Sequence, residues 1–438
     1  MDVIQASIPL FFALIGVELL VARLRRQSLY RLSDSIADLS CGTVSQLLGI
    51  FIAIGTITIY GLTARHLSMQ ALFGAPGWIE RTPFPATTGI PGFGIDAVAL
   101  LSWIVVFLLD DLTYYWVHRL SHEVNLLWAG HVVHHSSEEY NLTVALRQSG
   151  LHGLFTWVFY LPLAFLGVPV TMWIVCHGLN LIYQFWIHTR EIDRLPGPVE
   201  RVMNTPSHHR VHHGLNPQYR DKNYAGVFIV WDRLFGTFEP EVEAPVYGIT
   251  KPLASWNPVW ANLHVFVGIA AGVRQASRWG DKLKIVFGRP GWRPPELTAG
   301  ERPKSATPQT LVKYDPAVPR ALQGYAFTQF VAGLLASVAL LAAAPTLPVG
   351  QTLAGVFYLI LTLSNVGAIL EGRAWAAVSE LARLAVLAAA VSALLVRGHG
   401  PQTLLGGALV FALASAIWIV LLRPAFPASP ARTAVASP

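Results

Sequence analysis

Long apolar stretches are the feature of this sequence that most constrains its fold. A helix that crosses the hydrocarbon core of a bilayer needs about 20 mostly apolar residues. Charged residues make up only 13% of the chain, about half of their share in soluble domains. We therefore predict an all-α, polytopic integral membrane protein with about nine transmembrane helices. The nine stretches lie near 5–22, 38–62, 96–117, 325–344, 351–370, 375–396 and 402–422, with two more within 151–188, where Gly167-Val168-Pro169 marks a hairpin turn.

The positive charge of the chain is concentrated in one hydrophilic segment, residues 189–322. This segment holds 18 basic and 12 acidic residues and so carries the whole net charge of +6. Because basic loops are retained on the cytoplasmic side of membranes, we expect the segment to be cytoplasmic and the amino terminus to lie outside. No basic run with interleaved aromatic residues occurs, so we expect no nucleic-acid partner.

Composition also predicts a division into two membrane sections. The spans before residue 322 contain polar residues, whereas the last four are nearly all apolar and rich in Ala, Leu and Val, with Glu371, Glu380 and Arg383 as the charged residues in or beside them. We predict a membrane-embedded section that carries the chemistry (1–322), a C-terminal four-helix membrane section (323–422) and a disordered tail (423–438). Two cysteines, Cys41 and Cys176, both in apolar stretches, provide neither a disulfide framework nor a thiolate metal site.

Histidines are the strongest indication of chemistry. Twelve of the fifteen lie between positions 118 and 213. Residues at i, i+3 and i+4 of a helix project from one side, so such motifs can present several imidazoles to one metal ion, and more than four imidazoles imply two ions. With His188, the motifs all map to the cytoplasmic ends of the predicted helices. A single motif is equally consistent with a solvated patch, but three on one membrane face are not. The motifs are HxxxH at His118 and His122, HxxHH at His131, His134 and His135, and a second HxxHH at His209, His212 and His213, preceded by His208.

Two polar stripes run from the membrane toward these histidines. Asp111 shares a helical face with His118 and His122, as His177 and Gln184 do with His188. Asp111 lies about 10–12 Å along the helix from His118, too far to share a metal, so it either orients a more central group or makes a helix–helix hydrogen bond. The sequence leaves these two readings equally open. His152 and His177 are better explained as interior histidines with satisfied hydrogen bonds.

At these residues the sequence resembles the fatty acid hydroxylase/sterol desaturase superfamily, and within it the alkylglycerol monooxygenase family. The three histidine motifs match the superfamily. The narrower resemblance is found in HHSSEEYNL (134–142), ALRQS (145–149), QFWIHT (184–189), 204–214 and YGITKPL (247–253). It covers about residues 95–295.

The resemblance implies a membrane oxygenase with two iron ions. It makes metal ligands of His118, His122, His131, His134, His135, His188, His209, His212 and His213, with His208 as a substitute or a close neighbour. Some relatives have a further histidine where this chain has Gln184, which leaves one coordination position open. The family uses tetrahydrobiopterin, so the resemblance also implies a pterin, with Glu138, Tyr140, Asn141 and Arg147 as its contacts. Glu138 equally fits a structural role beside the capping-box pattern that begins at Ser136.

The implied chemistry is the oxidation of an unactivated lipid C–H bond by O2. For an alkylglycerol, hydroxylation of the ether-bearing carbon gives a hemiacetal that collapses to an aldehyde and glycerol. Asp111 and Glu138 are the candidate catalytic residues beside the metal, and the expected partners are a membrane lipid, O2 and either a reduced pterin or an electron-transfer protein. The alternatives are a sterol, carotenoid or fatty acyl hydroxylase or desaturase of the same superfamily, and, from another class, a metal-ion transporter. A transporter is disfavoured because its ligands would lie near the membrane midplane, and a bis-histidine haem protein would leave most histidines without a role.

Overall fold

The computed structural model describes residues 3–74, 97–298 and 306–426. The regular secondary structure of these residues is helical, with no β-strand. One isolated antiparallel bridge joins Gly214 and Tyr247. The described chain forms two compact units. The first comprises 1–30, 48–252 and 263–311, and the second comprises 31–47, 253–262 and 312–438. The predicted tail, 423–438, lies largely outside the described residues, and the predicted division at residue 322 stays a prediction.

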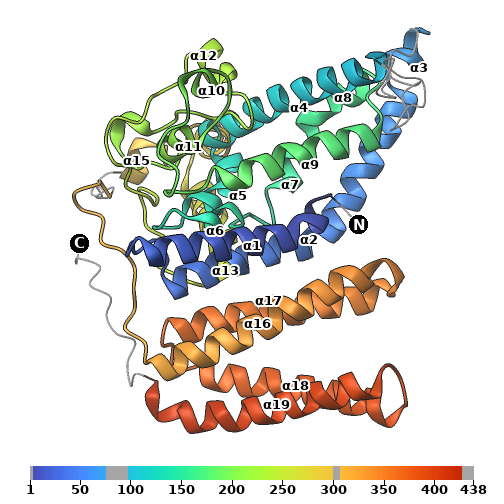
Figure 1. Ribbon diagram of the computed structural model, residues 1–438, viewed down its shortest axis with the longest axis vertical. Coiled ribbons are helices and arrows are strands. Elements are labelled where there is room, and N and C mark those ends of the chain that lie inside the picture. Colours follow the sequence, from blue (N-terminus) through green and yellow to red (C-terminus); the bar gives the residue numbers. More distant parts are fainter. Residues whose placement is uncertain (1–2, 75–96, 299–305, 427–438) are drawn as a thin grey trace. The chain divides into compact units, whose positions relative to one another are not determined.

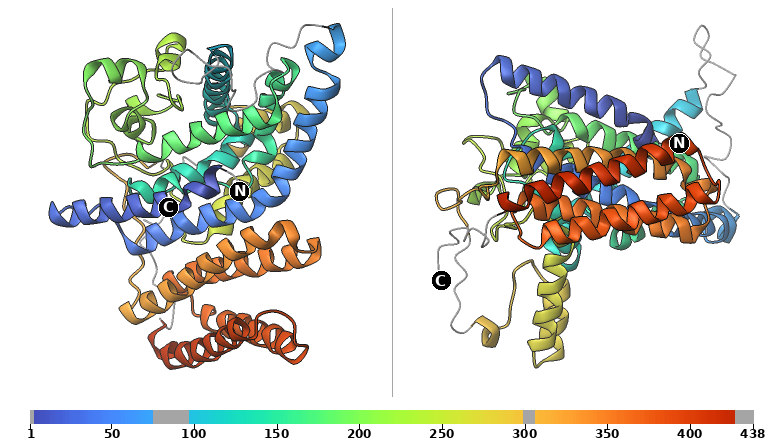
Figure 2. Two further views of the ribbon diagram at one scale, coloured as in Figure 1. Left: turned by 45° about the vertical axis from the view of Figure 1, so that its right-hand side comes forward. Right: turned by 90° about the horizontal axis from the view of Figure 1, so that it is seen from below.

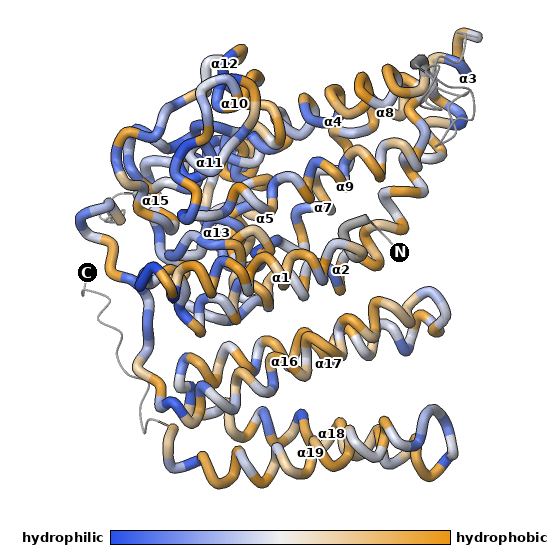
Figure 3. The backbone as a smooth tube through the Cα atoms, in the orientation of Figure 1, coloured by the Kyte–Doolittle hydropathy of each residue, from blue (hydrophilic) through white to orange (hydrophobic). Residues whose placement is uncertain are grey.

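The first unit is built on long apolar helices. Its frame includes α1 (Val3–Leu24), α4 (Ala97–Glu123) and α9 (Val170–Trp186), with α9 packed against both of the others (Figure 1). Val106 of α4 and Met172 of α9 belong to one buried apolar cluster, and the rings of Phe11 and Phe185 stack at 4.3 Å between α1 and α9. Apolar residues dominate these three helices in Figure 3. Their packing brings the carboxyl ends of α4 and α9 together.

Short helices and long loops cover this common end of α4 and α9. Two of them carry histidine motifs: α5 (Asn125–His135) and α11 (Pro206–His212). The hydrophilic colouring in Figure 3 gathers around this loop-rich part. The first unit also contains the short helices α6 (Leu142–Ala145), α7 (Gly153–Thr156), η1 (Trp157–Tyr160), α8 (Leu161–Phe165), α10 (Gly197–Val202), η2 (Pro217–Tyr219), α12 (Val230–Phe235), α14 (Trp279–Phe287) and α15 (Pro295–Thr298).

Four long helices account for most of the second unit. They form two hairpins, in which α16 packs against α17 and α18 packs against α19 (Figure 2). Each coincides with one of the last four apolar stretches of the sequence. Their bounds are Arg320–Ala343, Val349–Leu370, Ala376–Val396 and Gln402–Leu422, and short 3-10 turns follow α16 (η3, Ala344–Thr346) and α19 (η4, Arg423–Ala425).

Seven described helices are long and apolar enough to cross a membrane, two fewer than the nine predicted spans. The difference lies in the expected hairpin 151–188. Its first arm is only the broken helix Gly153–Phe165, which contains Pro162, and its second is the 17-residue α9. Between them Gly167 turns the chain at φ +87°, a conformation that favours glycine. The protein is thus an all-helical, multi-pass membrane protein in its described parts, and the count of nine stays a prediction.

The remaining helices differ from the expected bounds mainly by being longer. α2 (Leu32–His66) extends beyond the predicted 38–62 at both ends and is followed by α3 (Met69–Phe73). α4 continues six residues past the predicted end of its span, so His118 and His122 lie in its last turns. α13 (Pro258–Gln275) was not anticipated as a separate helix.

Candidate metal centre

The structure gathers nine histidines into two groups at the common end of α4 and α9. Within each group the candidate ligand atoms all lie within 4.8 Å of one another. Every member comes from a predicted motif or is the predicted His188. The larger group consists of His118, His122, His131, His135 and His212, and the smaller of His134, His188, His209 and His213.

Each HxxHH motif is shared between the two groups. In α5, His131 and His135 belong to the five-histidine group and His134 to the four-histidine group. In α11 the division is reversed, because His209 and His213 belong to the smaller group and His212 to the larger. Residues at i and i+4 are about 40° apart around a helix, whereas i+3 lies on the other side of i. The two helices therefore each supply both groups, an arrangement that the motif spacing permits but does not specify.

Backbone carbonyls hold several of these imidazoles by the nitrogen that faces away from the group. Nδ1 of His118 donates to the Tyr224 carbonyl (2.7 Å), and Nδ1 of His212 donates to the Lys222 carbonyl (2.9 Å). In the four-histidine group, His134 and His188 donate in the same way to the carbonyls of Arg147 (3.1 Å) and Gln184 (2.7 Å). Such a contact fixes the tautomer and leaves Nε2 with a lone pair for a metal.

The Nε2 atoms have the environment expected of metal ligands. In the five-histidine group, Nε2 of His118, His122 and His212 is buried without a hydrogen-bond partner. In the four-histidine group, Nε2 of His188 lies 3.2 Å from that of His134 and 3.0 Å from that of His209. Two ligands that are each about 2.1 Å from an ion are about 3.0–3.4 Å apart in octahedral or tetrahedral geometry. The residues present therefore fit a metal at each group.

Burial keeps the imidazoles of α5 and α11 neutral. It lowers the pKa of His131, His134, His135, His209 and His213 well below the usual value, and neighbouring imidazoles lower it further. Burial also lowers the pKa of His212 to about 4, although its contact with the Lys222 carbonyl opposes this shift. Neutral imidazole is the form that coordinates iron and similar metals.

Two residues that were considered as further ligands lie outside both groups. Nε2 of His208 is 3.0 Å from a carboxylate oxygen of Glu200. Gln184 accepts a hydrogen bond from Tyr114 (2.7 Å) and donates one to the side chain of Asn180 (2.7 Å). His152 also stands apart, with Nε2 2.9 Å from the Ser121 hydroxyl, which agrees with a satisfied interior histidine.

Asp111 contacts a loop and not the histidines. Its carboxylate accepts hydrogen bonds from the backbone N–H groups of Val227 (2.8 Å) and Phe228 (3.1 Å), from Nδ2 of Asn180 on α9 (2.8 Å) and from Nε1 of Trp231 (2.8 Å). A Cβ on Gly226 would come within 2.8 Å of this carboxylate and 2.6 Å of Asn180. Asp111 thus makes the predicted helix–helix hydrogen bond, to Asn180, and also fixes the loop that follows Tyr224. Its role as a catalytic residue beside the metal stays a prediction.

Sequence reasoning missed the loop Lys222–Ala225 and the residue that holds it, Asp232. The loop supplies the carbonyls that orient His118 and His212. The fully buried Asp232 accepts hydrogen bonds from the N–H groups of Tyr224 and Ala225, both at 2.8 Å. No motif in the sequence identifies these contacts, although an aspartate within a basic, hydrophilic segment could have been singled out as a candidate anchor.

The residues predicted to contact a pterin are all buried, but they lie in different environments. Tyr140 stacks on Tyr247 at 4.8 Å, and its ring lies 5.3 Å from that of His213 in the four-histidine group. Glu138 lies beside Gly248, whose Cβ position would be 3.6 Å from its Cγ. By contrast, Asn141 donates to the Leu29 carbonyl (2.8 Å) and Arg147 to the Val133 carbonyl (2.7 Å). Their roles in cofactor binding stay predictions.

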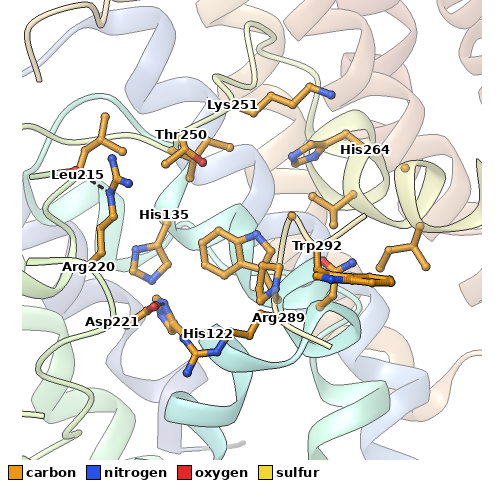
Figure 4. A pocket seen from close by; sticks show the side chains of 18 of the residues that line it. His122, His135, Leu215, Arg220, Asp221, Thr250, Lys251, His264, Arg289 and Trp292 are labelled. Carbon is orange, nitrogen blue, oxygen red and sulfur yellow. Dashed lines mark hydrogen bonds and ion pairs between the residues drawn. The ribbon is translucent and has the colours of Figure 1, made fainter. Parts of the chain in front are cut away.

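A cavity of about 490 Å³ reaches both histidine groups. Its inner wall includes His122, His135 and His212 of the larger group and His213 of the smaller. Figure 4 shows His122 and His135 facing the same space as Trp292, Arg289 and Lys251. A cavity of this size is typical of small-molecule sites, so it provides a route to the histidines.

Comparison with known proteins agrees with this arrangement. Residues 103–237 match the fatty acid hydroxylase family. The chain is 37% identical to alkylglycerol monooxygenase of Homo sapiens over 394 residues, which cover 87% of this chain and 81% of that protein. It is 34% identical to alkylglycerol monooxygenase of Danio rerio, over 88% of this chain and 81% of that protein. Ornithine lipid hydroxylase OlsE of Rhizobium tropici is 30% identical over 32% of this chain and 43% of its own length. No solved structure shows a significant match.

Proposed function

Because the chain belongs to the alkylglycerol monooxygenase family, we propose that it hydroxylates the ether-bearing carbon of alkylglycerols. The chain is an integral membrane, O2-dependent lipid monooxygenase with a histidine-built metal site, for which the family suggests iron. The proposal adds the substrate, two irons per chain, a pterin reductant and a cytoplasmic position of the site. The observation that supports it best is the pair of buried histidine groups.

In this proposal the five-histidine and four-histidine groups each hold one iron. Bound iron supplies the reduction of O2 and the oxidation of an unactivated C–H bond. The chain's own residues supply the ligand geometry, because the backbone carbonyls of Tyr224, Lys222, Arg147 and Gln184 fix four imidazole rings. Burial of the groups limits the access of water to the reacting carbon.

The overall reaction is balanced by one O2 and two electrons. One oxygen atom is inserted into the C–H bond next to the ether oxygen, and the other leaves as water together with two protons and two electrons from the reductant. The hemiacetal then collapses without further oxidant to a fatty aldehyde and glycerol. We propose tetrahydrobiopterin as the two-electron reductant, with Glu138 and Tyr140 among its contacts. The proposal is supported by the Tyr140 ring, which lies 5.3 Å from that of His213 in the four-histidine group.

Activity and metal content of the purified protein test this proposal. Purified in detergent, it should contain about two irons per chain. With O2 and reduced tetrahydrobiopterin it should convert an alkylglycerol to the corresponding aldehyde, detected by mass spectrometry. A matched acylglycerol, which lacks the ether, should give no aldehyde. The assignment would move to another branch of the superfamily if the protein turned over sterol or acyl lipids but not alkylglycerols. It would also move if turnover were independent of pterin and required an electron-transfer protein.

The cytoplasmic position of the site is supported by the basic segment 189–322, which contains α11 and the loop that orients His118 and His212. Its test is independent of activity. A protease site inserted near Asp193, whose side chain is 97% exposed, should be cut in inside-out vesicles and protected in right-side-out vesicles. The opposite pattern would place the histidines on the other face of the membrane.

A further inference from the structure

α14 carries two apolar faces, and one of them attaches it to a histidine helix. On the inner face, Ile285 is only 4% exposed and packs in a cluster with Ala129 of α5. Asn125, the first residue of α5, donates its side-chain N–H to the Ile285 carbonyl (2.8 Å) and its backbone N–H to the Gly288 carbonyl (2.9 Å). The helix that carries His131, His134 and His135 is therefore anchored to α14.

The outer face of α14 presents a row of large apolar side chains. Trp279, Leu283 and Phe287 follow i, i+4 and i+8, which places them on one side of the helix. They are 78%, 58% and 59% exposed. An exposed apolar row of this kind indicates contact with a membrane or a partner. α14 therefore packs on the first unit through its buried face. Its exposed apolar face has no partner among the residues that the structure describes.

Lysines border this row on both sides. Lys282 and Lys284 lie at the two edges of the apolar row, and the Lys282 ammonium is 5.0 Å from the centre of the Trp279 ring. Amphipathic helices with Trp and Leu on one face and lysines beside them lie in the membrane surface, where lysine stems extend along apolar groups and their ammonium groups reach the lipid phosphates. Charge and apolarity together favour an anionic lipid surface over a protein partner.

The cavity that reaches the histidines opens beside α14. Arg289, Trp292 and Arg293, which follow the helix directly, line it, as do Arg220 and Lys251. Figure 4 shows Trp292 opposite Arg220, with Arg289 between them and close to His122. Asp221 is the one acidic residue among the described residues that line this cavity. The lining therefore carries a clear excess of positive charge next to the apolar row.

We propose that α14 lies in the headgroup layer of the membrane, with Trp279, Leu283 and Phe287 among the upper acyl chains. The cavity then opens at the membrane surface, where a lipid can enter without crossing water. The polar end of this lipid is held by the basic residues that line the cavity opening, and the rest of the lipid extends toward the histidines. The position of α14 does not depend on the proposed function, whereas the passage of the substrate through this opening does.

Site-directed spin labelling in proteoliposomes tests the position of α14. Both native cysteines, Cys41 and Cys176, are buried, so single labels can be placed at Leu283→Cys and, as a water-exposed control, at Asp193→Cys, where the native side chain is 97% exposed. We expect the label at position 283 to collide more with O2, which dissolves in lipid, than with a water-soluble nickel complex. The label at 193 should show the reverse ranking.

Two results would overturn the position of α14. The first is a label at 283 that is as accessible to the nickel complex as the label at 193. The second is shielding at 283 that increases with the protein-to-lipid ratio, because this would mean that a second copy of the chain, and not lipid, covers the row.

Kinetics then test the passage of the substrate. The double change Leu283→Asp and Phe287→Asp should raise KM for an alkylglycerol embedded in vesicles about tenfold and leave kcat unchanged. KM for the same lipid dispersed in detergent should not change, and Asp281→Asn serves as the control. An unchanged KM in vesicles would refute the entry route. Absence of turnover in the wild type would refute the proposed function but leave the labelling result valid.

Discussion

Polar groups are buried among apolar helices in both units, but they are satisfied in different ways. In the second unit, Arg383 pairs with Glu380 at 2.5 Å and donates to Gln329 (2.8 Å), while Glu380 also accepts from Asn365 (2.6 Å). In the first unit, the nine histidines face one another, and Nε2 of His118, His122 and His212 has no partner. The first arrangement satisfies its own charges, whereas the second leaves buried nitrogens that a bound cation would satisfy.

This difference separates a structural network from a reactive site. The Glu380–Arg383 network connects α16, α17 and α18, and Gln329 extends it to Ser415 on α19 (2.9 Å). It is therefore well suited to specifying how the four helices associate in a medium without water. The histidine groups would be unfavourable as a purely structural device, because buried imidazole nitrogens without partners carry a desolvation cost. The contrast leads to four predictions.

The largest effect should follow the loss of a metal ligand. His134→Ala removes an imidazole from the four-histidine group. We expect monooxygenase activity to fall by more than about 100-fold, a larger loss than that caused by changing a residue that only holds a metal ligand in place. Iron content should drop toward one per chain by elemental analysis. His66→Ala, a change at an exposed histidine outside both groups, is the control. Full iron content in His134→Ala would contradict the assignment of this group.

The next largest effect should be on stability and not on chemistry. Arg383→Met leaves Glu380 buried without its partner, which should destabilise the protein by about 3–5 kcal/mol, measured by unfolding in detergent. Activity per folded molecule should stay near that of the wild type. The double change Glu380→Leu with Arg383→Met removes the unpaired buried carboxylate and should restore part of the stability; the rest stays lost because Asn365 and Gln329 no longer have these partners. A double variant as unstable as the single one would show that the network does more than satisfy its own charges.

Asp232→Asn should weaken one histidine group selectively. The amide cannot accept both loop N–H groups as the carboxylate does, so the Tyr224 and Lys222 carbonyls lose their fixed position behind His118 and His212. We expect iron affinity of the five-histidine group to fall about 10- to 100-fold while the four-histidine group stays loaded. Titration of the apoprotein with ferrous iron measures both sites. Equal weakening of the two groups would indicate a general loss of structure, and Asp232→Glu should recover part of the affinity.

The smallest effect should come from Tyr140→Phe. This change removes the hydrogen bond from the Tyr140 hydroxyl to the Ile187 carbonyl (3.0 Å), worth about 1 kcal/mol, but keeps the stack on Tyr247. Thermal stability should decrease slightly and iron content should not change. If Tyr140 contacts a pterin through its ring, KM for the pterin should also stay within about twofold of the wild type. A large rise in that KM would show that the hydroxyl itself takes part in binding.

Much of the site could be predicted because its information is local. The spacing within HxxHH fixes which side of a helix His131, His134 and His135 occupy, and all nine histidines named as ligands lie in the two groups. What sequence reasoning missed depends on contacts between distant segments. The Tyr224 carbonyl behind His118 comes from a residue 106 positions away, and no helical periodicity predicts which loop crosses behind which imidazole. The apolar composition of the predicted hairpin 151–188 likewise does not reveal where its first helix breaks, between Gly153 and Phe165.

The sequence by itself determined that this chain is an integral membrane protein and that its histidines gather at one end of its helices. Both follow from local properties, the length of the apolar stretches and the spacing of residues along a helix. Only the tertiary structure decided that α5 and α11 each divide their histidines between two groups, and that His208 and Gln184 stand outside both. The physical reason is that a group of metal ligands forms only where side chains from several helices point in the direction of one place. That direction is set by packing across the whole unit and not by the spacing within any one segment.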